Sequence, residues 1–188
     1  GRLLYVGREF PGLPSRYSKD FDDSADTVPV EDREALFLYE SFDGGENWEY
    51  VSKLPGKEGV ANDKLCEPHL VETLDGEIIV AIRAHDDPAY DHFGVYFTSS
   101  KDGGKTWSEL WSLGKIGSPP HLLLRRDGSI LVTYGRRSAP FGIRAVVSYD
   151  GCRTFSEEFI LSEARNGDLG YPATTELADG TLVSVEGT

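Results

Sequence analysis

Short apolar runs alternate with polar, glycine-containing turns along most of the chain. The clearest runs, each four to six residues long, lie at 78–83, 94–99, 130–134, 143–147 and 182–185. Runs this short, bounded by Gly, Pro, Asn and Asp, are typical of β-strands rather than of helices. The pattern therefore predicts an all-β protein built from short antiparallel strands.

The strands belong to a repeat with a period of 52 residues. A proline at the start of each unit and a glycine in its first turn recur at this spacing: Pro68, Pro120 and Pro172, and Gly76, Gly128 and Gly180. Each unit reads as four strands, of which the first runs from the proline to an Asp-Gly turn and the second is the apolar run after it. A fixed period of this length, made of strands and tight turns, indicates a propeller or a related array.

A second motif marks the turn between strands three and four. Residues 41–48 read Ser-Phe-Asp-Gly-Gly-Glu-Asn-Trp, residues 100–107 read Ser-Lys-Asp-Gly-Gly-Lys-Thr-Trp, and residues 148–155 are a looser copy with Cys152 and Phe155. In such a turn Ser and Asp hydrogen-bond the backbone, Gly accepts positive φ and the aromatic ring packs onto the sheet. The motif is the Asp-box, and the sequence resembles the Asp-box β-propellers of the sialidase (neuraminidase) superfamily.

The resemblance implies a six-bladed propeller in the intact family, of which this chain covers roughly three to four four-stranded antiparallel blades. We expect one partial propeller domain over residues 1–188, with a blade carrying the Asp-box 41–48, a blade at 66–112, a blade at 119–161 and a partial blade at 171–188. Thirteen strands are too few for six blades. The expectation is therefore an excerpt that lacks about two blades upstream and part of one downstream, with a small closed or swapped assembly as the alternative.

The composition and net charge argue against several classes of binding partner. Its 188 residues include 21 glycines and 10 prolines, which suits a turn-rich β domain, and a net charge of -13 argues against nucleic acid or an anionic membrane surface as a partner. No apolar run is long enough to span a membrane. The negative net charge does not exclude an anionic ligand, because a few arginines can set the local electrostatic potential of one pocket. The compartment is left open, with a secreted or periplasmic location preferred.

The cysteines and the acidic residues do not indicate a bound metal or cofactor. Cys66 and Cys152 are expected to be free thiols. The long loop at 9–34 carries four aspartates, Asp20, Asp22, Asp23 and Asp26. Their spacing does not match an EF-hand, so we interpret them as a solvated acidic loop, and we expect neither a metal nor a cofactor.

Strand direction decides which end of each blade carries chemistry. In an antiparallel meander the start of strand one and the end of strand two lie at one end, whereas the Asp-Gly and Asp-box turns lie at the other. The positions just before each proline are Glu67, Pro119 and Tyr171, and those at the end of strand two are Arg83, Arg136 with Arg137, and Gly187. An acid, a phenol and two or three arginines are therefore expected to converge near the axis.

These residue types fit the hydrolysis of an acidic sugar. A phenol becomes nucleophilic when an adjacent carboxylate takes its proton, and a neutral nucleophile avoids repelling an anionic substrate. Arginine binds a carboxylate with its planar fork and stays charged. Glu67 with Tyr171, beside Arg83 and Arg136 or Arg137, thus forms a candidate site for a sugar of the sialic acid type.

The family resemblance assigns roles to the same positions. Sialidases have an Asn/Cys-Glu-Pro segment followed by an Asp-Gly turn and an apolar strand ending in Arg, and Cys66-Glu67-Pro68 through Arg83 is similar. The resemblance implies that Tyr171 is the nucleophile and that Glu67 is its general base. It also implies that Arg83, together with Arg136 or Arg137, belongs to an arginine triad, with Arg144 as a weaker choice. Pro172 departs from the serine usual in the family. The family's acid/base aspartate and remaining arginine come from its first blades, so this polypeptide alone is not expected to be a competent sialidase.

Other interpretations stay open from the sequence. The main alternative is a non-catalytic carbohydrate-binding or protein-interaction propeller, which Pro172 favours; a hydrolase or lyase for another uronate-type sugar uses the same arginines. His69 and His121 occupy equivalent strand positions and are interpreted as structural. His85 and His92 are placed in the loop after strand two, and no pattern links them to a substrate.

Overall fold

The fold is that of a computed structural model, which describes residues 1–8 and 35–187. The aspartate-rich loop with Asp20, Asp22, Asp23 and Asp26 lies outside the described residues. Thirteen strands and two short 3-10 helices, η2 (Asn62–Lys64) and η3 (Pro88–Tyr90), make up the regular structure of the part that is described. The architecture is all-β, as predicted.

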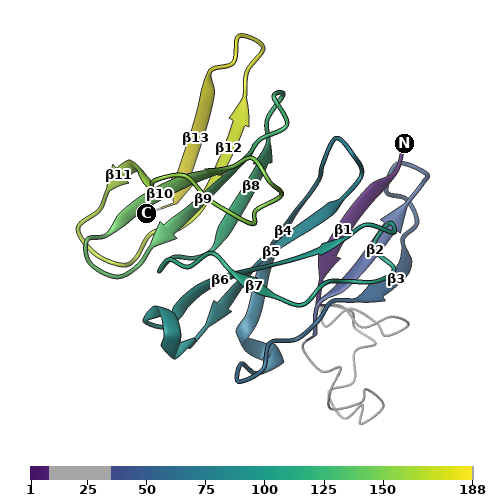
Figure 1. Ribbon diagram of the computed structural model, residues 1–188, viewed down its shortest axis with the longest axis horizontal. Helices are drawn as coiled ribbons and strands as arrows, with labels where there is room; N and C mark the ends of the chain where they lie inside the picture. Colours follow the sequence, from purple (N-terminus) through teal and green to yellow (C-terminus); the bar gives the residue numbers. More distant parts are fainter. Residues whose placement is uncertain (9–34, 188) are drawn as a thin grey trace.

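Four antiparallel sheets follow one another along the chain (Figure 1). The first holds β1 (Leu3–Gly7), β2 (Phe37–Ser41) and β3 (Glu49–Lys53). The second holds β4 (Leu65–Glu72), β5 (Ile78–His85), β6 (Phe93–Ser100) and β7 (Trp111–Ser112). The third holds β8 (Pro120–Leu124), β9 (Ile130–Arg136), β10 (Gly142–Ser148) and β11 (Phe159–Glu163), and the fourth β12 (Gly170–Glu176) and β13 (Leu182–Gly187).

Each sheet is a meander, because strands adjacent in the sequence are paired in space. The first strands of successive sheets also lie side by side, with β4 in contact with β8 and β8 in contact with β12. Sheets that stack face to face in this way, each contributing its first strand to the inside, form a β-propeller. The prediction of a partial propeller of roughly three to four blades is confirmed.

The second strand of each unit is longer than its apolar run. β5 continues past Arg83 to His85, β9 continues to Arg136, and β13 reaches Gly187. His85 is therefore the last residue of a strand and not part of the following loop, where the sequence pattern had placed it. The cause is the ladder to the third strand, in which His85 pairs with Phe93 and Arg136 with Gly142.

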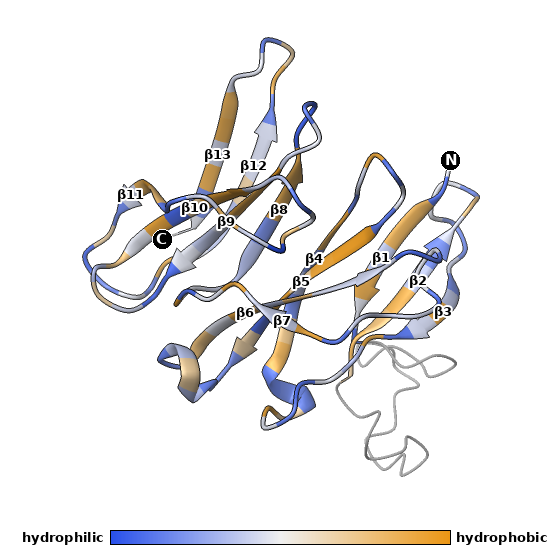
Figure 2. Cartoon of the chain, in the orientation of Figure 1, coloured by the Kyte–Doolittle hydropathy of each residue, from blue (hydrophilic) through white to orange (hydrophobic). Residues whose placement is uncertain are grey.

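Two apolar cores lie between neighbouring sheets, and β5 contributes to both. Ile79 and Ala81 belong to the core shared with the third sheet, whereas Ile78, Val80 and Ile82 belong to the core shared with the first. Successive side chains of a strand point to opposite faces, so a strand covered on both faces reads as a continuous apolar run. In Figure 2, most strands contain apolar segments, whereas the turns between them are more hydrophilic.

The Asp-box turns have the expected local chemistry. Ser100 donates its hydroxyl proton to Asp102 at 2.8 Å and accepts the amide of Gly104 at 2.8 Å. Asp102 in turn accepts the amides of Lys105 and Thr106 at 3.0 and 2.9 Å. Gly104 has φ +92°, a conformation that favours glycine. The turn is thus closed by side-chain bonds that Ser, Asp and Gly are suited to make.

The same turns also contact the preceding sheet. The Trp107 indole donates to the hydroxyl of Ser52 at 2.8 Å, and that hydroxyl donates to the carbonyl of Gly104 at 2.5 Å. One unit later, the Trp111 indole donates to the carbonyl of Cys152 at 2.6 Å, and the Arg153 guanidinium lies 3.5 Å from the centre of the Trp111 ring. The Asp-box therefore joins neighbouring sheets, at the end of the blades opposite to the predicted site.

Acid is expected to weaken the fold through these turns. Burial opposes ionisation of Asp150, but bonds from Thr154, Ser148 and Arg153 outweigh it and lower its pKa from 3.8 to about 2. Because the unfolded chain binds this proton more readily than the folded chain, the stabilisation is present above about pH 4 and lost as the pH falls toward about 2. We expect Asp150→Asn to lower the urea midpoint at pH 6, with the deficit shrinking toward pH 2. A deficit that stays constant with pH would contradict this account.

Candidate functional site

Glu67 and Tyr171 occupy equivalent bulges at the starts of β4 and β12. The pairing of β4 with β5 shifts register between Cys66 and His69, and that of β12 with β13 shifts between Gly170 and Ala173. Glu67 has φ +47° and Tyr171 has φ +53°, which residues with a side chain rarely adopt. Strain of this kind costs about 1 to 3 kcal/mol and gathers at functional sites. The bulges turn both side chains out of the regular strand pattern.

The two side chains meet across the axis. The hydroxyl of Tyr171 donates to Oε1 of Glu67 at 2.9 Å, although the residues are 104 positions apart. The other carboxylate oxygen, Oε2, accepts from Nη1 of Arg83 at 2.7 Å. The Tyr171 residue is 59% exposed, so its hydroxyl lies at an open surface. Glu67 thus holds a phenol with one oxygen and a guanidinium with the other.

Arg83 is held in place from several sides. The residue is only 8% exposed, and burial by itself lowers the pKa of a cation, but the hydrogen bond and the charge of Glu67 outweigh burial and raise the pKa of Arg83 above its usual value. Its Nη2 lies 2.9 Å from Nδ1 of His85. Arg83 therefore stays a cation behind the Glu67 carboxylate.

Of the two consecutive arginines at the end of β9, Arg137 reaches the pair of Glu67 and Tyr171. Its guanidinium carbon lies 5.6 Å from the centre of the Tyr171 ring, within the range of a cation–π contact. Gly170 makes this approach possible, since a Cβ there would lie 2.9 Å from Nη2 of Arg137, and its φ of +142° also favours glycine. The sequence left the choice between Arg136 and Arg137 open.

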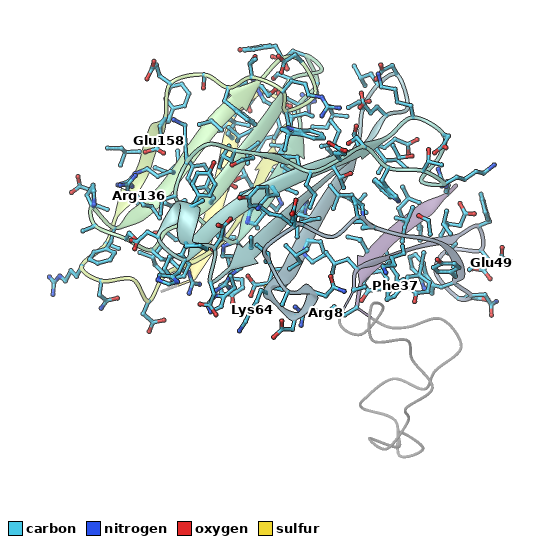
Figure 3. All side chains as sticks on the ribbon, turned by 60° about the horizontal axis from the view of Figure 1, so that its bottom comes forward. Arg8, Phe37, Glu49, Lys64, Arg136 and Glu158 are labelled. Atoms are coloured by element: carbon cyan, nitrogen blue, oxygen red, sulfur yellow. The ribbon has the colours of Figure 1, made fainter. Side chains whose placement is uncertain are left out.

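Arg136 points elsewhere. It is the last residue of β9, and its Nη2 donates to the carbonyl of Ala139 at 3.4 Å, in the turn between β9 and β10 (Figure 3). Neighbouring residues of an extended chain project to opposite sides, which separates it from Arg137. Its role in substrate binding stays a prediction.

Arg144, the weaker sequence candidate, is a core residue. It is 2% exposed, and its guanidinium donates to the carbonyls of Pro140 and Ser162 at 3.0 Å each. Its Nε lies 3.5 Å from Glu158, which also accepts the hydroxyl of Tyr134 at 2.5 Å. The charge of Arg144 is therefore used inside the third sheet and not at the Tyr171 pair.

Unpaired donors accompany the site arginines. In the described part of the chain, the Nε atoms of Arg83, Arg136 and Arg137 are buried and have no hydrogen-bond acceptor. A buried N–H without an acceptor is costly, and such groups in native proteins usually find a partner. The Nε of Arg125, at the other end of the third sheet, shares this property, so the unpaired atoms alone do not mark a binding site.

Histidines on the inner strands pack against each other. The rings of His69 and His121 lie 4.2 Å apart, and Nδ1 of His69 accepts the amide of Leu122 at 3.2 Å. Burial, together with the neighbouring His121, lowers the pKa of His69 to about 4. These contacts match the structural interpretation of both residues. The contact of His85 with Arg83, which sequence reasoning missed, had one signal: the two residues lie two positions apart in a strand and so share a face.

A pocket of about 320 Å³ lies away from this site. Its wall is formed by β10, β11, β13 and the segment before β12, including Ser162, Arg165 and Glu186. Neither Glu67 nor Tyr171 is among its lining residues. The pocket also holds a hydroxyl–carboxylate pair, in which Ser162 donates to Glu186 at 2.8 Å. A phenol loses its proton to a carboxylate more readily than a serine hydroxyl does, so we place the candidate site at Tyr171 and Glu67, on the open surface. Cys66 and Cys152 are free thiols, and in the part of the chain that the structure describes no helix is long and apolar enough to cross a membrane.

Comparison with solved structures identifies the fold. A protein of unknown function from Dyadobacter fermentans is 28% identical, with a TM-score of 0.68 over 92% of this chain and 42% of its own. An α-L-arabinanase of Penicillium chrysogenum is 18% identical, with a TM-score of 0.62 over 81% of this chain and 49% of its own. The NanB sialidase of Streptococcus pneumoniae is 20% identical, with a TM-score of 0.57 over 81% of this chain and 24% of its own. The chain spans less than half the length of each.

Sequence comparison identifies the family. No curated protein matches the chain. The model of the BNR repeat-like domain matches residues 28–184, which include all three Asp-boxes and both members of the Tyr171–Glu67 pair. The chain therefore belongs to the family of BNR repeat-like domains.

Proposed function

We propose that this chain carries the nucleophile and the base of a glycoside hydrolase that removes a terminal acidic sugar, of the sialic acid type, from a glycoconjugate. The observation that carries the proposal is the 2.9 Å hydrogen bond from the Tyr171 hydroxyl to Glu67, whose second oxygen is fixed by Arg83. A carboxylate in this position accepts the phenolic proton as the oxygen attacks. The glycosidase-type fold supports the reaction class.

The reaction proceeds in two steps. The Tyr171 oxygen attacks the anomeric carbon, its proton passes to Glu67, and the glycosidic oxygen leaves with the bonding electron pair and takes a proton from solvent or a general acid. Water then attacks the same carbon, the bond to Tyr171 breaks, and Glu67 returns the proton to the phenolate while the proton of the water passes to solvent. Two displacements at one carbon retain the anomeric configuration.

Positive charge favours an acidic sugar. Arg137 lies over the Tyr171 ring and Arg83 lies behind Glu67, so two cations flank the reacting groups. A neutral phenol adds no negative charge against a substrate carboxylate, which a carboxylate nucleophile would. We propose that Arg137 contacts the sugar carboxylate and that Arg83 and Arg136 add positive charge to this end of the sheets.

The chain is proposed to act as one partial propeller domain over residues 1–188. The four sheets correspond to a blade with the Asp-box 41–48, blades at 66–112 and 119–161, and a partial blade at 171–188. The site lies where the second, third and fourth of these units meet. A complete ring would surround it on all sides.

The test is hydrolysis of aryl glycosides by a protein in which this chain forms part of a complete ring, because the chain alone is not expected to be a competent sialidase. We expect release of the aryl group from an α-sialoside, with little release from a neutral α-L-arabinofuranoside, and NMR of the first product should show retained configuration. Inversion would exclude a covalent Tyr171 intermediate, and preference for the arabinoside would exclude an acidic substrate. Binding of sialic acid without hydrolysis would instead favour the non-catalytic carbohydrate-binding alternative.

A further inference from the structure

His85 contacts the far side of the Arg83 guanidinium. The two residues lie on the same face of β5, and Nη2 of Arg83 is 2.9 Å from Nδ1 of His85. The opposite ring nitrogen, Nε2, lies 3.2 Å from Oδ1 of Asp86. The edge of the Phe93 ring lies against the imidazole, with ring centres 6.1 Å apart. The imidazole is thus fixed at both nitrogens and along one side.

The partners determine where the imidazole carries its proton. A guanidinium has five N–H donors and no acceptor, so Nδ1 must accept and cannot carry a hydrogen. The proton then resides on Nε2, which faces the Asp86 carboxylate at 3.2 Å. This tautomer gives Arg83 an acceptor on one terminal nitrogen while Glu67 occupies the other. Arg83 is held in one orientation by two acceptors of different kinds.

We propose that His85 is a positioning residue for the proposed reaction and acts through Arg83 on Glu67. A continuous series of hydrogen bonds runs from His85 through Arg83 and Glu67 to the Tyr171 hydroxyl, and the Asp86 carboxylate lies 3.2 Å from Nε2 of His85. Fixing Arg83 fixes Oε2 of Glu67, which leaves Oε1 aimed at the phenol. The inference rests on the proposed function of Glu67 as the base for Tyr171.

Burial separates this role from substrate binding. Arg83 is only 8% exposed, whereas Tyr171 is 59% exposed and Arg137 lies over its ring. A substrate at the Tyr171 hydroxyl therefore meets Tyr171 and Arg137 before it meets Arg83. Loss of His85 should disturb proton transfer more than binding, since a misplacement of about 1 Å in a reacting group costs as much as about 100-fold in rate.

Three substitutions test the proposal in the protein with the complete ring. His85→Phe keeps a ring of similar size without an acceptor, and we expect kcat to fall between about 10- and 100-fold with KM within about twofold. His85→Gln places an amide oxygen within reach of Arg83 and should restore most of the rate. His92→Phe is the matched control, because its Nδ1 lies 3.8 Å from the same Asp86 carboxylate and the residue does not bond Arg83. A raised KM with unchanged kcat in His85→Phe would overturn the proposal.

The tautomer offers a readout that needs no activity. Two-bond proton–nitrogen correlation spectra, with the His85 signals identified by their loss in His85→Gln, should show a bare Nδ1 and a protonated Nε2 at neutral pH. A proton on Nδ1 would overturn the inference even if hydrolysis is observed. If no acidic sugar is hydrolysed while Nδ1 is bare, the proposed function fails and the hydrogen-bond series stands.

Discussion

Tyr171→Phe is expected to reduce hydrolysis by about 10³-fold or more, because the variant lacks the oxygen that forms the covalent bond to the sugar. Ligand binding should remain nearly unchanged. The aromatic ring stays available to Arg137, and only the bond from the hydroxyl to Glu67 is lost. Steady-state kinetics with an aryl α-sialoside and calorimetric titration with the free sugar measure the two effects separately.

Tyr149→Phe is the matched control for this substitution. Tyr149 is 79% exposed and lies in the third Asp-box, at the other end of its sheet, so removal of its hydroxyl should leave turnover within about twofold. Turnover by Tyr171→Phe at a rate near that of the parent protein would show that the nucleophile is another group.

Arg144→Leu is expected to lower the free energy of unfolding by about 3 to 5 kcal/mol, the range found when one partner of a buried ion pair is removed. The substitution leaves the carbonyls of Pro140 and Ser162 without this donor and Glu158 without its cation. Leucine fills part of the volume but satisfies none of these acceptors. Urea unfolding followed by circular dichroism measures the loss.

Lys101→Leu provides the comparison on the surface. Its side chain is 79% exposed and lies 3.9 Å from Glu77, so the change should stay within about 0.5 kcal/mol. A loss below about 1 kcal/mol in Arg144→Leu would contradict the structural assignment. Weaker ligand binding in a fully folded Arg144→Leu variant would return Arg144 to the set of substrate-binding arginines.

The repeat explains why so much of the fold is predictable. Two units carry a proline, an Asp-Gly turn and an Asp-box, and the units at either end carry part of this set. These are local signals whose chemistry depends on a few adjacent residues. The antiparallel order then places Glu67 and Tyr171 at the same end of their sheets without knowledge of any distance. Their hydrogen bond follows from the position of both residues just before a repeated proline.

The parts that sequence reasoning missed depend on non-local packing. The bulges that give Glu67 and Tyr171 positive φ arise from register shifts against the second strands, which no single segment encodes. The extension of β5 to His85 depends on pairing with Phe93. Nothing in the sequence distinguishes Arg144 from an exposed arginine. Only the surrounding carbonyls and Glu158 in the folded protein show that it is buried.

The most direct test of the central claim is mass spectrometry of the protein after incubation with an acidic sugar that carries an activated leaving group and a fluorine beside the anomeric carbon, which slows the second step. The account predicts a covalent sugar adduct on the peptide that contains Tyr171, absent from Tyr171→Phe. An adduct on Glu67, or turnover of the sugar with no adduct on Tyr171, would contradict it.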